Sequence, residues 1–118
     1  MARAAVVQGP PPAPRAVVVA PDAEIRDDWA RALEAAGMQV TRCAGPTVSC
    51  VILRDGCRCP LLDEAGVAIY HEAGLSERFE AALRGVGTRA MVVATRDRHR
   101  ADGSHEPAMS RVIAQPSG

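Results

Sequence analysis

The sequence predicts a small α/β protein with a parallel β-sheet and helices on both of its faces. Short apolar runs, which are typical of strands buried on both faces, alternate with segments that place apolar residues on one side of a helix. Gly, Pro, Asp and Ser stand between these segments, where turns and helix caps are expected. The 118 residues are enough to bury one core. We place this single domain at residues 16–114, between a disordered Pro-rich arm at 1–15 and a frayed tail at 115–118.

The first predicted unit is a strand, a helix and a second strand. The strand is the apolar run Ala16–Ala20, and Asp22 follows it as the expected N-cap of the helix. The apolar face of this helix consists of Ile25, Trp29, Leu33 and Ala36. Gly37 is expected to close the helix in the left-handed conformation, and Met38–Arg42 to form the second strand.

The second unit begins with a third strand at Gly66–Tyr70. A helix follows, for which Ser76 is the expected cap and Gly85 and Gly87 mark the end. Its apolar face consists of Leu75, Phe79, Leu83 and Val86. The fourth strand is Arg89–Ala94. Because the two units repeat the same alternation, we expect the flavodoxin-like strand order 2-1-3-4, with the last strand missing or degraded.

The chain becomes polar after the fourth strand. We interpret the run Arg96–Arg100 as a solvated loop, because Asp97 and Asp102 dilute its positive charge. The pair Gly103-Ser104 marks a further loop. Residues 107–114 fit either a short helix or a weak edge strand.

Composition excludes several classes of partner. The formal net charge is zero, lysine is absent, and there is one Trp, one Tyr and one Phe, so we expect neither nucleic acid nor a membrane surface as a partner. No apolar run reaches membrane-spanning length, and the prolines near the N-terminus interrupt the apolar stretch that a signal peptide needs. We therefore expect a cytoplasmic protein with reduced thiols, bound to a protein partner that the sequence does not identify. The oligomeric state stays open.

A family resemblance lies near the N-terminus. The segment Val17-Val-Val-Ala-Pro-Asp22, continued through residues 33–40, resembles the start of a response-regulator receiver domain. The order of strands and helices extends this resemblance loosely to Thr95. It implies a receiver-like scaffold, in which carboxylates at the strand ends hold magnesium and accept a phosphoryl group.

The catalytic groups of that family are missing here. Ala20 and Pro21 stand where receivers carry an acidic pair, and Tyr70 or His71 stands where the acceptor aspartate is expected. Thr95 matches the hydroxyl residue of the fourth strand, but the chain has no lysine to act as the switch residue. Magnesium needs oxygen ligands, and phosphoryl transfer needs the charge neutralisation that the bound magnesium ion brings. We therefore expect a degenerate receiver that binds or regulates without phosphotransfer, and we favour a role other than catalysis.

All four cysteines lie within residues 43–59, inside an insertion predicted at 43–65. They are Cys43, Cys50, Cys57 and Cys59. Their pattern, Cys-Ala-Gly-Pro, then Cys, then Gly-Cys-Arg-Cys-Pro-Leu-Leu-Asp, resembles that of uncharacterised small bacterial proteins, which implies no activity. Because such clustering within one short stretch is unusual for core thiols, we interpret this insertion as the centre of any chemistry.

The local pattern predicts a hairpin in this insertion. Residues 48–54 look like a strand, and Asp55-Gly56 is a signal for a two-residue turn. Side chains alternate along strands, so Cys50, Cys57 and Cys59 would share one face of such a hairpin. Cys43, which ends the second strand, would approach the same face.

Four roles for the cysteines remain open. A structural zinc site of all four thiols is our leading interpretation, although gaps of six, six and one residues differ from common zinc motifs. An iron–sulfur cluster is less favoured. The alternatives are a thiol redox sensor or redox protein that uses Cys57 and Cys59, and a purely structural interaction module with inert, buried thiols.

A second candidate site gathers polar residues at strand ends. His71 and Glu72 follow the third strand, and Asp22 and Thr95 follow the first and fourth. The carboxyl ends of parallel strands meet at one edge of the sheet, where ligands bind in open α/β sheets. These four residues therefore form a candidate polar site, although a solvated loop left from a lost active site explains them as well.

Overall fold

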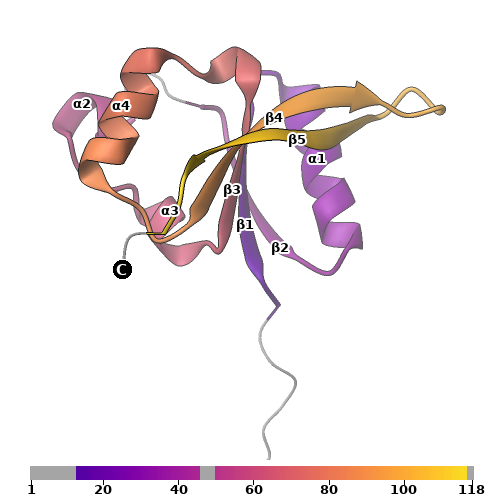
Figure 1. Cartoon of the computed structure of the whole chain (residues 1–118). Helices are drawn as coiled ribbons and strands as arrows, with labels where there is room; N and C mark the ends of the chain where they lie inside the picture. The colour runs from indigo at the N-terminus through magenta and orange to yellow at the C-terminus, as the bar shows by residue number, and fades with distance from the viewer. Residues whose placement is uncertain (1–12, 46–49, 117–118) are drawn as a thin grey trace, which may run out of the picture.

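The computed structural model describes residues 13–45 and 50–116, which form an α/β domain around a five-stranded mixed sheet (Figure 1). In chain order its elements are β1 (Arg15–Val19), α1 (Ala23–Ala35), β2 (Gln39–Cys43), α2 (Val51–Asp55), α3 (Pro60–Glu64), β3 (Val67–His71), the 3-10 turn η1 (Glu72–Gly74), α4 (Glu77–Val86), β4 (Met91–His99) and β5 (His105–Ala114). The strand order is β2-β1-β3-β4-β5. The predicted order 2-1-3-4 is therefore confirmed for the first four strands.

The sheet is not wholly parallel, which corrects the prediction. The pairings among β2, β1, β3 and β4 are parallel, but β5 runs antiparallel to β4. A fifth strand is thus present, and it reaches its place by a tight turn, where a further parallel strand would need a crossover of a dozen or more residues.

Helices cover both faces of the sheet, as predicted (Figure 1). On one face α1 packs over Val18, Ile69 and Val93 through Trp29 and Ala30. On the other face lies a larger core under α2, α3 and α4, which includes Val17, Val19, Ile52, Leu62, Ala68, Tyr70, Phe79, Leu83, Val92, Ala94 and Ile113. Successive residues of β1 serve opposite cores, and that is why its sequence is apolar throughout.

Local signals place the longer helices correctly. Asp22 Oδ1 accepts a hydrogen bond from the backbone N–H of Ile25 at 3.0 Å, and Ser76 Oγ accepts one from Phe79 N–H at 3.1 Å. Each satisfies a first-turn N–H that has no partner within its helix. Gly37 follows the end of α1 with a φ of 94°, as predicted for a left-handed closing residue.

The predicted solvated loop at residues 96–100 is wrong for residues 96–99, because β4 continues through Arg96 to His99, and only Arg100 lies in the turn. Residues 107–114 belong to β5, which settles the choice between a helix and an edge strand. In the outer half of this β4–β5 hairpin, apolar and polar residues do not alternate, so the usual sequence signal of a strand is missing there. Charged pairs stabilise it instead, for example Arg98 Nε with Glu106 Oε1 at 3.2 Å.

The hairpin predicted around Asp55-Gly56 is wrong. Residues 51–55 form the short helix α2, and Gly56 ends it with a φ of 64° while its N–H bonds to the carbonyls of Ile52 and Val51. A left-handed glycine serves a helix end as well as a two-residue turn, so the dipeptide alone does not distinguish them. Burial of Ile52, which is 2% exposed, favours the helix. Residues 46–49, where the predicted strand began, lie outside the described part of the chain.

Candidate functional site

A pocket of about 360 Å³ opens beside the carboxyl ends of β1, β2 and β3. We call it the thiol pocket; its lining residues are Val19, Cys43, Ala44, Gly45, Cys50, Val51, Ile52, Cys59, Pro60, Leu61 and Tyr70. Ligands of open α/β sheets bind at this edge of the sheet. The walls are mainly apolar, so the three thiols and the Tyr70 hydroxyl are its chemically distinctive groups.

Three separate elements bring the three thiols to this pocket. Cys43 is the last residue of β2 and pairs in register with Val19 of β1. Cys50 is the N-cap residue of α2, and Cys59 is the N-cap residue of α3, where Pro60 occupies the first helical position. All three cysteines are half-buried and none forms a disulfide. The structure therefore brings three of the four cysteines to one pocket, from two helix starts and a strand end, in place of the predicted hairpin face.

Tyr70 marks the point on which these thiols converge. Burial raises the pKa of its phenol far above the ordinary value of 10.0, and the nearby thiols of Cys59, Cys43 and Cys50 raise it further. The phenol therefore stays protonated at neutral pH. The pocket thus places one neutral hydroxyl group near three cysteine thiols.

Cys57 lies apart from the other three cysteines. Its side chain is exposed, and its Sγ lies 3.6 Å from the carbonyl oxygen of Asp55. The expected common face of Cys50, Cys57 and Cys59 does not form, because the segment that carries them is helical on both sides of Gly56. Among residues 13–45 and 50–116, no three cysteine sulfurs come within 4.8 Å of one another. The four cysteines are thus not arranged as a metal site.

Two of the four polar residues predicted at the strand ends, Asp22 and Glu72, are engaged in separate contacts. Asp22 caps α1, and Glu72 forms an ion pair with Arg96 and accepts a hydrogen bond from Ser110 Oγ at 2.7 Å. Both of these partners hold the pKa of Glu72 below its usual range, with Ser110 the larger cause. This carboxylate is already satisfied and leaves little free charge for a ligand.

His71 and Thr95 do lie side by side, since they pair in register between β3 and β4. The His71 ring stacks on Trp29 at 5.3 Å, and its Nδ1 accepts a hydrogen bond from Ala73 N–H at 3.0 Å. Thr95 is 1% exposed, and its Oγ1 has no hydrogen-bond partner within the described residues. The structure therefore brings together two of the four residues.

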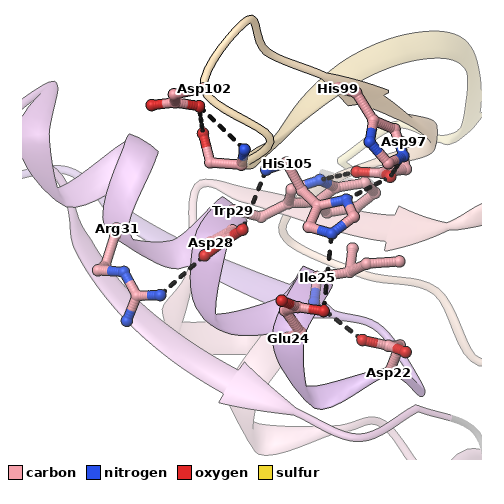
Figure 2. Close-up of polar contacts among 11 residues, drawn as sticks. Asp22, Glu24, Ile25, Asp28, Trp29, Arg31, Asp97, His99, Asp102 and His105 are labelled. Atoms are coloured by element: carbon pink, nitrogen blue, oxygen red, sulfur yellow. Dashed lines mark hydrogen bonds and ion pairs between the residues drawn. The ribbon is translucent and has the colours of Figure 1, made fainter.

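The sequence reasoning missed a cluster on the β4–β5 hairpin (Figure 2). We call Asp97, His99 and His105 the hairpin cluster; their ligand atoms all lie within 4.8 Å of one another. The available signal was the spacing of Asp97 and His99, which places both on one face if residues 96–100 form a strand. Because residues 96–100 were interpreted as a loop, this shared face of Asp97 and His99 was not predicted.

Within the two described ranges, no helix is long and apolar enough to cross a lipid bilayer. Comparison with protein-family models, with curated proteins and with solved structures finds no match to this chain.

Proposed function

We propose that this chain is a receiver-like binding or regulatory domain without phosphotransfer, and that the thiol pocket is its ligand site. The ligand that fits best is a thiophilic metal ion, with zinc as the first candidate. One observation carries this proposal. Cys43, Cys50 and Cys59 come from three elements to one pocket, whereas Cys57, two residues from Cys59, stays outside it.

The receiver-like part of the proposal is supported by the order of the first four strands and by helices on both faces. Ala20 and Pro21 follow β1 and His71 ends β3, so these positions offer no carboxylate for magnesium. The pocket lies at the same sheet edge, on the side of α2 and α3. Binding thus takes place beside the positions that receivers use for phosphorylation.

A metal ion can bind in this pocket only if the sulfurs of Cys43, Cys50 and Cys59 move closer together. Zinc binds thiolate sulfur at about 2.3 Å, which puts two sulfurs of a tetrahedral site about 3.8 Å apart. The described sulfurs lie further apart than such a trio allows. Cys50 and Cys59 stand at the starts of helices of only five residues each, and we propose that these short helices shift on metal binding so that the two sulfurs approach Cys43. Binding energy that orders this insertion becomes folding energy.

The test compares Cys59→Ser with Cys57→Ser under reducing conditions. Cobalt serves as the probe, because a thiolate-to-cobalt absorption band in the near ultraviolet reports sulfur ligands directly. We expect the band in the wild type and in Cys57→Ser, and its loss in Cys59→Ser. Elemental analysis of protein purified without chelator then tells whether zinc is the native occupant.

Each other outcome has a definite meaning. Loss of the band in both variants would restore a four-cysteine site and overturn the assignment of three ligands. No band in the wild type would overturn the metal site. In that case a reversible disulfide on mild oxidation would support the redox alternative, and unreactive thiols the interaction module.

A further inference from the structure

The β4–β5 hairpin brings two imidazoles and a carboxylate together by strand geometry alone. Asp97 and His99 are two residues apart on β4 and so share one face, and His105 on β5 is the register partner of His99. The His99 and His105 ring centroids lie 4.7 Å apart, edge to face. Asp97 Oδ2 lies 2.6 Å from His105 Nδ1 and 3.6 Å from His99 Nε2.

Helix α1 holds two of these three residues, Asp97 through its side chain and His105 through its backbone (Figure 2). Trp29 Nε1–H donates to Asp97 Oδ1 at 3.1 Å, which leaves Oδ2 directed at the histidines. The backbone N–H of His105 donates to Asp28 Oδ2 at 3.0 Å. The Asp97 and His105 side chains are 13% and 12% exposed, while that of His99 is 70% exposed. Two of the candidate ligands are thus nearly buried next to α1, and the third is open to solvent.

The charge around the cluster favours a cation. Around His105, Glu24 Oε1 lies 3.9 Å from Nε2, Asp97 Oδ2 lies 2.6 Å from Nδ1, and Asp28 Oδ2 accepts a hydrogen bond from the backbone N–H. Arg31, which pairs with Asp28 at 2.8 Å, compensates one of these three negative charges. A divalent ion between neutral imidazoles would balance the remaining two.

We propose that the hairpin cluster is a binding site for a divalent transition-metal ion of the zinc class. Asp97 Oδ2, His99 Nε2 and one ring nitrogen of His105 are its protein ligands, and water completes the coordination. The site is independent of the thiol pocket and of the function proposed for it. It ties the outer end of the hairpin together next to α1.

Two of the three distances between ligand atoms are close to those that zinc requires. Zinc binds imidazole nitrogen and carboxylate oxygen at about 2.0–2.2 Å, so ligand atoms of a tetrahedral site lie about 3.4 Å apart. The separation of 3.6 Å between Asp97 and His99 already matches. The hydrogen bond of 2.6 Å between Asp97 and His105 must lengthen by less than about 1 Å as the metal replaces its proton. The Trp29 contact to the other oxygen of Asp97 is of the kind that orients metal-binding carboxylates.

The three histidines of the chain allow an internally controlled experiment. We propose to add zinc stepwise to the full chain and to follow the histidine side-chain resonances by NMR. The signals of His99 and His105 are expected to shift together and to saturate. His71 stacks on Trp29 but lies outside the cluster, so its signal should stay in place. Equal perturbation of all three histidines, or of none, would overturn the proposal.

A pair of variants separates ligand loss from disturbance of the hairpin. His99→Ala removes an exposed ligand and should weaken zinc binding at the cluster by at least about tenfold, as judged by the His105 signal. Arg98→Gln changes the neighbouring exposed residue, which pairs with Glu106, and should bind zinc at least as tightly as the wild type. Unchanged affinity in His99→Ala would show that the cluster is only a hydrogen-bonded contact between hairpin and helix. Thiol-pocket occupancy is read from the cobalt–sulfur band, so failure of one site is distinguishable from failure of the other.

Discussion

The indole of Trp29 in α1 donates a hydrogen bond to the carboxylate of Asp97 in β4, over 3.1 Å and across 68 residues of chain. Trp29 is fully buried, and its N–H is the one polar group that it must satisfy. Asp97 accepts this hydrogen bond, and it belongs to the part of β4 that extends beyond the apolar core. The contact therefore couples the core under α1 to the hairpin cluster.

The Trp29→Phe substitution should destabilise the protein by about 1–3 kcal/mol, since it removes the donor and leaves a part-buried carboxylate oxygen without its partner. Urea unfolding in the presence of chelator measures this change. A double-mutant cycle with Asp97→Ala, which removes the acceptor, isolates the contact, and we expect a coupling energy of at least about 0.5 kcal/mol. Additive effects of the two substitutions would contradict this account.

Stability should fall in acid because of Glu80. Its carboxylate is bound by Arg111 at 2.6 and 2.9 Å and also by Arg84, and the Arg111 hydrogen bonds are the main reason that its pKa lies below the ordinary 4.5. A carboxyl whose pKa is lower in the folded state stabilises the fold above its unfolded pKa, and this stabilisation is lost as pH falls through the folded value. Unfolding curves between neutral pH and acid should show that loss below about pH 4.5.

Glu80→Gln should flatten this dependence on pH, because an amide does not titrate. Glu77→Gln is the matched control, since Glu77 is an exposed residue of the same helix. The control should keep the acid sensitivity of the wild type. The same slope in Glu80→Gln and in the wild type would assign the acid sensitivity to other carboxyls.

Two glycines should respond oppositely to alanine. Gly56 has a φ of 64° with open space around it, so Gly56→Ala should cost about 1–2 kcal/mol through backbone strain alone. Gly85 lies inside α4, also with open space, and Gly85→Ala should stabilise the protein by about 0.5–1 kcal/mol. Chemical denaturation of both variants provides the comparison. Stabilisation by Gly56→Ala would show that α2 does not end in a left-handed residue.

Acetyl phosphate with magnesium should not phosphorylate the chain. Ala20 and Pro21 supply no carboxylate after β1, and β3 ends in Tyr70-His71 without an acceptor aspartate. Mass spectrometry after incubation measures the incorporation, with an active receiver domain as the positive control. One stable phosphoryl group per chain would disprove the loss of phosphotransfer.

The regular part of the fold could be predicted from the sequence because its signals are local. Val17 to Ala20 are apolar in succession, since alternate residues serve cores on opposite faces. Asp22 and Ser76 cap helices by contacts that span three residues. Such patterns can be recognised in the sequence without knowledge of the tertiary structure.

The β4–β5 hairpin and the candidate sites could not be predicted in the same way. Beyond Thr95 the strands leave the core, so burial no longer imposes alternation on residues 96–108. The side of the insertion on which each cysteine lies depends on how α2 and α3 pack, which spacing along the chain does not reveal. Cys57 and Cys59 illustrate this, because a single intervening residue separates an exposed thiol from one that lines the pocket.

The antiparallel placement of β5 also bears on the order in which the molecule assembles. Arg100 and Ser104 close the turn between β4 and β5 with a hydrogen bond of 2.8 Å, so these strands can pair within a short, contiguous part of the chain. Hairpins form in about 1–10 μs, whereas each parallel pairing must first close a longer loop at a greater cost in entropy. The β4–β5 pair can therefore form before the parallel pairings and offer β3 a ready-made edge on which to dock.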